Sequence, residues 1–175
     1  TYGVPEHGYA VVTLHRPSNV DQPEVLSGIL DLLLDQAQSL PMVWPLHPRT
    51  RARIEALGRL DEVEAATGLH LTPPLGYLEF MSCVASSRCV ITDSGGIQEE
   101  TTWLGVPCLT LRPNTERPIT LTEGTNVLTT PSSLREDLKR ALEGPTRHDV
   151  SIDLWDGGTA ERCVTSLRKH LRGLG

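Results

Sequence analysis

The chain has 175 residues, of which 38% are hydrophobic and 22% charged, a composition typical of a globular domain with its own core. No apolar run approaches the ~20 residues that a membrane-spanning helix needs, which argues against a membrane protein. A formal net charge of −6 argues against a nucleic-acid module, although a local pocket can be positive on an acidic protein.

Strand and helix patterns alternate along the chain. In chain order they predict a strand at 9–14, a helix at 25–36, a strand at 42–46, a helix at 51–57, a strand at 70–72, a helix at 78–85, a strand at 89–91, a helix ending at 104, strands at 107–111 and 125–128, a helix ending at 144 and a helix at 159–171. We expect the helix at 78–85 to be buried and the last one to be amphipathic.

End signals support several of these helices. Asp21-Gln22-Pro23 offers a cap and a first-turn proline, and Pro41 ends the helix that follows. Ser133 and Glu136 have the spacing of a capping box for the helix that ends at Gly144. The alternation predicts an α/β doubly wound domain: a mostly parallel, Rossmann-like sheet with helices on both faces. Ligands of such sheets bind beyond the carboxyl ends of the strands.

The run Thr92–Glu100, with the sequence TDSGGIQEE, lies between a strand and a helix. The two glycines let the backbone approach a ligand, and the free N–H groups and dipole of the first helical turn favour an anion. Glu100 lies one turn after Gly96 on the same face. Its carboxylate would repel a bound phosphate, unless it accepts hydrogen bonds from hydroxyl groups such as those of a ribose. An ordinary loop followed by a helix-stabilising Glu is the alternative.

Polar segments follow the other predicted strands as well. They are His15-Arg16, His47-Pro48-Arg49, Asp93-Ser94 and the run from Arg112 to Pro118. In a parallel sheet these segments converge on one edge, where they would form an anion pocket with titratable groups. Simpler interpretations are a capped loop histidine at 15, a loop-shaping histidine at 47 and a salt-bridge cluster of Arg112, Glu116 and Arg117.

The spacing of the histidines and cysteines argues against a metal site and against a disulfide framework. The six histidines show no paired ligand spacing, so we expect no metal site, and neither a G-x-S-x-G elbow nor a Walker lysine is present. The four cysteines, Cys83, Cys89, Cys108 and Cys163, show no C-x-x-C pair, and three lie in apolar stretches. We expect buried, reduced thiols and a cytoplasmic protein. Because the chain begins at Thr1 without Met, we also expect it to be part of a longer protein.

Five segments together resemble the C-terminal half of the non-hydrolysing UDP-N-acetylglucosamine 2-epimerases. In family order they are TLHRPSN at 13–19, HPRT at 47–50, TDSGGIQEE at 92–100, TERP at 115–118 and GTN at 124–126. The segments at 92–100 and 115–118 together are a specific signal for this family, whereas each of the other three segments alone is a weak signal. The family has two Rossmann-like domains in the glycosyltransferase-B arrangement, with the active site between them. The resemblance implies that residues 1–175 are the UDP-binding second domain, and that the first domain, with the catalytic carboxylates, is absent from this chain.

The resemblance also implies roles for particular residues. Ser94, Gly95 and Gly96 would bind the diphosphate, Glu100 the ribose and Arg117 the phosphates. His15 matches a histidine implicated in catalysis. Arg16 and His47 match positions that contact a second, regulatory UDP-sugar in some members.

The implied reaction inverts C2 of a UDP-sugar by elimination and re-addition of UDP, without a cofactor. The partners implied are the UDP-sugar, the missing domain and, left open, a second copy of the full-length protein; the product would be a cell-surface polysaccharide precursor. Two departures from the family pattern, Ile119 and Pro17-Ser18, leave the exact sugar and the regulatory site open. A glycosyltransferase of the same architecture and a non-catalytic nucleotide-sugar-binding module are the alternatives.

Overall fold

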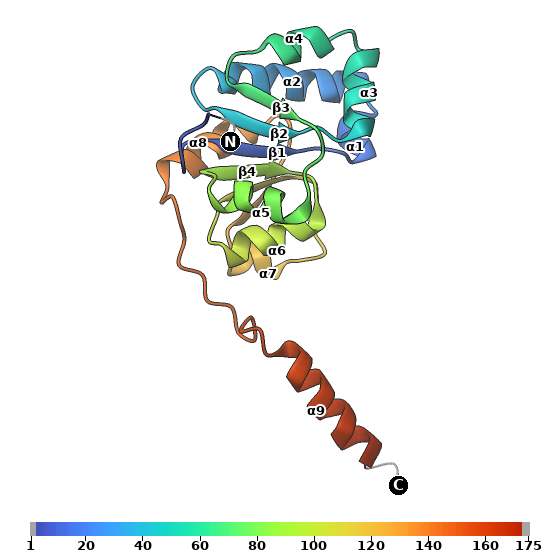
Figure 1. Cartoon of the computed structure of the whole chain (residues 1–175), viewed down its shortest axis with the longest axis vertical. Helices are drawn as coiled ribbons and strands as arrows, with labels where there is room; N and C mark the ends of the chain where they lie inside the picture. Colours follow the sequence, from blue (N-terminus) through green and yellow to red (C-terminus); the bar gives the residue numbers. More distant parts are fainter. Residues whose placement is uncertain (1–2, 173–175) are drawn as a thin grey trace.

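The computed structural model describes residues 3–172, and its centre is one six-stranded sheet (Figure 1). The strand order is β3-β2-β1-β4-β5-β6, and each neighbouring pair is parallel. The strands are β1 (Ala10–Thr13), β2 (Met42–Pro45), β3 (Leu69–Thr72), β4 (Cys89–Thr92), β5 (Cys108–Leu111) and β6 (Asn126–Thr129). The predicted α/β class, strand positions and parallel sheet are confirmed.

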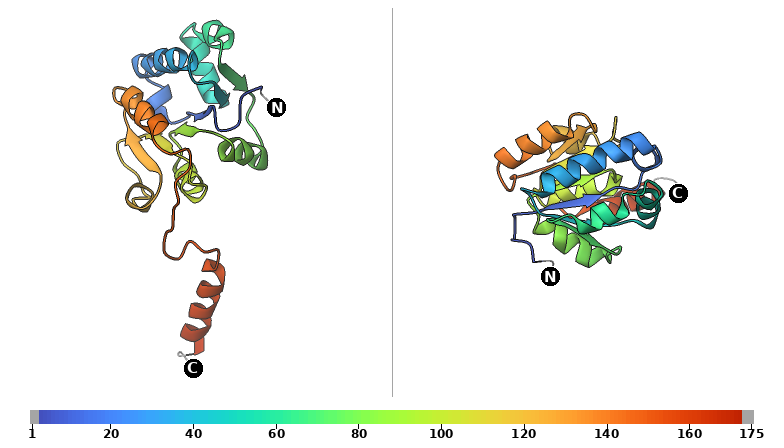
Figure 2. Two further views of the ribbon diagram at one scale, coloured as in Figure 1. Left: turned by 90° about the vertical axis from the view of Figure 1, so that its left-hand side faces the viewer. Right: turned by 90° about the horizontal axis from the view of Figure 1, so that it is seen from above.

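Helices cover both faces of the sheet. They are α1 (Pro17–Val20), α2 (Pro23–Ala37), α3 (Pro48–Ala56), α4 (Leu60–Ala65), α5 (Tyr77–Ala85), α6 (Gly95–Trp103), α7 (Ile119–Thr122), α8 (Leu134–Glu143) and α9 (Thr159–Arg172). The view from above in Figure 2 shows α2 and α8 on one side of the sheet and α5 on the other.

Two hydrophobic clusters, one on each face, hold the layers together. Ala10 and Val12 of β1 belong to the cluster beneath α2 and α8, whereas Val11 belongs to the cluster with α5. Since both faces of β1 are buried, its sequence is a continuous apolar run rather than an alternating one. Helix α2 contributes fully buried side chains such as Ile29 and Leu33. Burying each of these stabilises the fold by about 1.5–3 kcal/mol.

Three local expectations were wrong. Helix α5 is not buried throughout, because Tyr77 and Leu78 at its start are 66% and 82% exposed. The capping box does not form: Ser133 accepts from the amide of Thr130 instead of capping α8, and Glu136 pairs with Arg140. Asp21 does not cap α2 either, since Gln22 occupies that position and the Asp21 carboxylate binds Arg49 and Arg53 of α3.

The last helix, α9, is amphipathic as predicted and lies apart from the sheet, beyond a long extended segment (Figure 1). Its apolar residues Val164, Leu167 and Leu171 are exposed. None of the helices within residues 3–172 is long and apolar enough to cross a bilayer.

The cysteines divide into a buried and an exposed group. Cys83, Cys89 and Cys108 are free and buried, as expected, whereas Cys163 on α9 is free and exposed. Burial raises the pKa of Cys89 to about 12 and that of Cys108 to about 11, so neither is a reactive thiolate near neutral pH.

Gly68, just before β3, meets a backbone requirement that other residues cannot. Its φ is +86°, and an added Cβ would lie 2.2 Å from the carbonyl oxygen of Ala37. We predict that Gly68→Ala lowers the free energy of unfolding by at least about 1–3 kcal/mol, because a left-handed backbone and a backbone clash combine. Gly28 in α2 has open space around its Cβ position. Gly28→Ala is therefore the control, expected to stabilise by about 0.5–1 kcal/mol. Urea denaturation measures both, and equal effects would contradict the prediction.

Candidate active site

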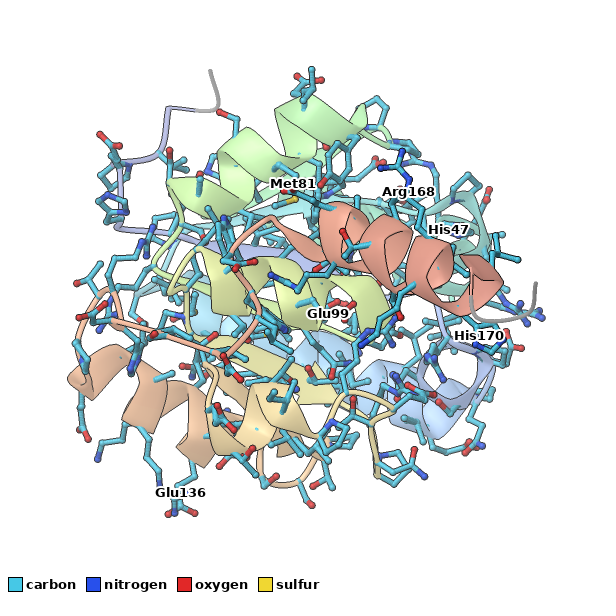
Figure 3. All side chains as sticks on the ribbon, turned by 90° about the horizontal axis from the view of Figure 1, so that it is seen from below. His47, Met81, Glu99, Glu136, Arg168 and His170 are labelled. Atoms are coloured by element: carbon cyan, nitrogen blue, oxygen red, sulfur yellow. The ribbon has the colours of Figure 1, made fainter. Side chains whose placement is uncertain are left out.

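The polar segments that follow the strands meet at the carboxyl edge of the sheet. The rings of His15, after β1, and His47, after β2, have centroids 5.7 Å apart. Both histidines and Ser94, after β4, line one pocket of about 230 Å³. Figure 3 labels His47, which follows β2 in the chain, and Glu99 of α6. The expected convergence of these segments is therefore observed.

The glycine turn leads directly from β4 into α6. Ser94 occupies the N-cap position in an extended conformation, and no side chain within the described residues caps the helix. Gly96 is exposed, and a Cβ added there would meet nothing within 4 Å. The first turn of α6 therefore has N–H groups without a capping side chain from this part of the protein, and together with the helix dipole these groups favour an anion.

Two arginines lie over this turn. A Cβ at Gly95 would be 2.8 Å from Nη1 of Arg117 and 3.7 Å from Nη1 of Arg112. Only glycine leaves the Arg117 guanidinium this close to the backbone, and any larger side chain must displace it. Arg117 therefore lies beside the glycine turn, and its predicted role at the phosphates stays a prediction.

Carboxylates hold both guanidinium groups in place. Arg117 Nε donates to Glu99 at 2.6 Å, and Arg112 Nη2 donates to Glu116 at 2.6 Å. The bond from Arg112 lowers the pKa of Glu116 to about 2, so Glu116 is charged throughout the physiological range. The salt-bridge interpretation of Arg112 and Glu116 is thus correct, and it coexists with a position beside the anion site.

Arg112 lies in the run that the sequence predicts for the anion pocket, but the sequence assigns it no binding role of its own. Its side chain is 4% exposed, and its Nη1 is buried without a hydrogen-bond partner among residues 3–172. A buried donor of a charged group without a partner is costly, and a bound anion would satisfy it. The sequence signal for such a role is the position of Arg112 directly after β5, which corresponds to the position of Asp93 directly after β4.

Glu100 lies on α6 one turn beyond Gly96. Tyr77, at the start of α5, hydrogen-bonds to the Glu100 carboxylate, and this bond raises the pKa of the Tyr77 hydroxyl. Glu100 as a whole is half-buried. The hydroxyl of Tyr77 is thus a hydrogen-bond partner of this carboxylate, which fits the prediction that Glu100 binds hydroxyl groups of a ligand.

His15 is paired with a buried carboxylate that the sequence did not reveal as its partner. Asp93 is fully buried, and its oxygen lies 3.0 Å from Nδ1 of His15. Asp93 also accepts from the amides of His15 and Arg16 and from Asn19 Nδ2. Burial alone would raise the Asp93 pKa, but these hydrogen bonds outweigh it and the pKa is lowered.

The same contact sets the protonation of His15. Its hydrogen bond with Asp93 raises the His15 pKa above the ordinary 6.5, against an opposing effect of burial. Nδ1 is committed to Asp93, which fixes the ring orientation and leaves the second nitrogen to act on a ligand. His15 is thus both held in its loop and oriented like a functional histidine.

Arg16 and His47, the two residues matched to a regulatory contact, lie at the margin of this site. The amide of Arg16 binds Asp93, while His47 caps α3 by accepting from the amide of Arg49 at 3.1 Å. The loop-shaping interpretation of His47 is therefore correct, and its ring still lines the pocket. Among residues 3–172, no cluster of three or more His, Cys, Asp or Glu side chains could hold a metal ion.

Comparisons with known proteins agree with this geometry. A family model described as UDP-N-acetylglucosamine 2-epimerase matches residues 1–168. A UDP-N-acetylglucosamine 2-epimerase of Methanocaldococcus jannaschii is 37% identical over 137 residues, which cover 77% of this chain and 37% of that protein. A UDP-2,3-diacetamido-2,3-dideoxy-D-glucuronate 2-epimerase of Pseudomonas aeruginosa is 43% identical over 124 residues, covering 70% and 33%.

A solved structure is also similar. The crystal structure of Methanocaldococcus jannaschii UDP-GlcNAc 2-epimerase in complex with UDP-GlcNAc and UDP superposes with a TM-score of 0.81 at 33% identity. The match covers 92% of this chain and 45% of that one. The chain therefore spans less than half the length of these relatives.

The contact between His15 and Asp93 predicts a pH effect. We expect Asp93→Asn to lower the His15 pKa, because the raising hydrogen bond and charge are lost. A raised folded-state pKa means that protonated His15 stabilises the fold. That stabilisation is complete below pH 6.5 and is lost as the pH rises through the folded-state pKa, so the variant should lose this pH dependence. NMR titration of the ring protons measures the pKa, with His170 on α9 as internal control. An unchanged His15 pKa would refute the assignment.

Proposed function

The chain belongs to the UDP-N-acetylglucosamine 2-epimerase family, and on that premise we propose that it is the UDP-binding domain of an enzyme that interconverts UDP-GlcNAc and UDP-ManNAc. The observation that carries the proposal is the uncapped glycine turn at the start of α6 with two arginines over it. Such a turn binds a diphosphate through backbone N–H groups and fixed positive charge.

The diphosphate is bound by Ser94, Gly95 and Gly96, with Arg117 supplying charge on one side and the free nitrogen of Arg112 on another. Glu100 binds the ribose hydroxyls, which replace the Tyr77 hydroxyl as hydrogen-bond partners of its carboxylate. The neighbouring pocket, lined in part by Leu75, Phe80 and Ile97, offers apolar walls to a planar base.

The reaction removes the proton at C2 while the bond between C1 and UDP breaks, giving a glycal. UDP then adds back to C1 as C2 is reprotonated on the other face. This half of the enzyme stabilises the departing diphosphate, which gains charge as the bond breaks, through preorganised donors. His15, oriented by Asp93, is the catalytic residue contributed by this chain.

The proposed domain division is supported by the share of the relatives that this chain covers, which is less than half of their length. Residues 1–175 supply the nucleotide half, and a preceding domain in the glycosyltransferase-B arrangement supplies the acid and base carboxylates. Arg16 and His47 provide a contact for a second, regulatory UDP-sugar. The buried free thiols fit a cytoplasmic enzyme. The similarity to an epimerase of a diacetamido uronate sugar keeps other UDP-2-acetamido sugars in the substrate class.

The site can be tested by comparing how two substitutions affect the binding of UDP and of pyrophosphate. We expect Arg117→Ala to weaken both UDP and pyrophosphate about tenfold or more, because a charge-assisted hydrogen bond contributes about 1.5–3 kcal/mol. Glu100→Ala should weaken UDP by a similar factor and leave pyrophosphate nearly unchanged. Arg135→Ala, which breaks an ion pair with Asp35 elsewhere on the surface, is the matched control. Calorimetric titration gives the affinities. Equal losses of both ligands in Glu100→Ala would remove it from the ribose site.

A labelling experiment tests the activity and the division of labour. The chain alone, incubated with UDP-GlcNAc in deuterated water, should give no deuterium at C2 by NMR, because the preceding domain to which we assign the acid and base carboxylates is not in the sample. The full-length protein should exchange C2 without an acceptor, which a glycosyltransferase or a non-catalytic module would not do. Deuterium incorporated by the chain alone would place the whole catalytic set within these residues.

A further inference from the structure

A buried amide connects the two parts of the diphosphate site. Gln98 lies on α6, one turn after Ser94, and is fully buried. Its Nε2 donates to the carbonyl oxygen of Ser94 at 3.1 Å. Its Oε1 accepts from Thr115 Oγ1 at 2.6 Å, and Thr115 Oγ1 accepts in turn from the amide of Arg117 at 3.0 Å. Three hydrogen bonds therefore lead from the glycine turn to the backbone of Arg117.

A second buried amide closes this path into a ring. Asn126, at the start of β6, donates to Gln98 Oε1 at 2.9 Å and to Thr120 Oγ1 at 3.2 Å. Thr120 Oγ1 donates to the carbonyl oxygen of Arg117 at 2.8 Å. The carboxamide oxygen of Asn126 accepts from Thr110 of β5 at 2.6 Å. The N–H and the C=O of Arg117 are thus both tied to the ring.

We propose that Gln98 is a positioning residue that sets the Arg117 guanidinium against the glycine turn through this ring. The proposal rests on the proposed function, because it deepens the role of the diphosphate site. Arg117 Nη1 lies close to the turn, 2.8 Å from where a Cβ on Gly95 would stand, so the placement of the Arg117 backbone affects the charge presented at the turn.

The ring joins two elements that carry the site, the start of α6 and the loop after β5, to the neighbouring α7–β6 region. Both heavy atoms at the end of the Gln98 amide are bonded, so the amide fixes a distance between its partners as well as filling space. An apolar side chain of similar shape would fill the same volume and leave the Arg117 loop without this connection.

A double-mutant cycle tests the proposal by UDP titration. Gln98→Met keeps the shape of the side chain and breaks the ring, and should weaken UDP about tenfold while leaving uridine nearly unchanged. In an Arg117→Ala background the same change should cause no further loss, because Gln98 acts through Arg117. Thr115→Val breaks the same path on the half-exposed loop. It is run in both backgrounds, so the test stands if Gln98→Met does not fold.

Thr101→Val is the matched control. Thr101 is equally buried on α6, and its hydroxyl donates to the backbone carbonyls of Ile97 and Gln98 within the helix, but to none of the side chains of the ring. It should lower the melting temperature and leave the ratio of UDP to uridine affinity unchanged. The role of Gln98 would be overturned if its substitution weakened UDP binding as much in the Arg117→Ala background as in the unmutated chain. Wild-type UDP affinity in both Gln98→Met and Thr115→Val would overturn it as well. The proposed function would stand in either case. Failure of the unmutated chain to bind UDP would overturn both.

Discussion

The carboxylate of Asp93 is the interaction on which the arrangement of the site depends. It is fully buried, and it accepts from the amides of His15 and Arg16 and from the amide group of Asn19. Asn19 also donates to the carbonyl of Leu111 at the end of β5. The Asp93 carboxylate therefore connects the loops after β1 and β4 directly, and Asn19 extends the connection to the end of β5. A buried charge is tolerated only with such complete pairing, so these loops cannot separate without leaving it uncompensated.

The acidic net charge of the chain and its anion site are compatible because the charge is arranged locally. Arg112 and Arg117 lie beside the glycine turn, and each is held by a carboxylate on its outer side. Their inner nitrogens face Gly95. Glu99 and Glu116 thus act as fixed supports that orient positive charge inward before any ligand arrives. Preorganised charge of this kind costs no reorganisation when a diphosphate binds or departs.

The site lies at one edge of the sheet, where a second domain of an enzyme could cover it. Ser94, Gly96, His15 and Glu100 all lie at one edge of the sheet, and parallel strands require this because their carboxyl ends share that edge. A ligand bound there would keep one side exposed to water. Chemistry at a sugar carbon needs groups on that open side and the exclusion of water, which is the role we assign to the facing domain.

Much of this protein could be predicted from local patterns alone. The order of strands and helices follows from apolar periodicity, and the glycine turn before α6 follows from two glycines between a strand and a helix. Other features depend on contacts between distant residues: Asp93 meets His15 across 78 positions, and Asn19 meets Leu111 across 92. The unpartnered nitrogen of Arg112 and the ring around Gln98 exist only because the folded sheet brings their neighbours together. Periodicity also could not foresee that the start of α5 is exposed or that Ser133 bonds to Thr130. Those outcomes depend on which neighbours each side chain finds, and the tertiary structure alone determines them.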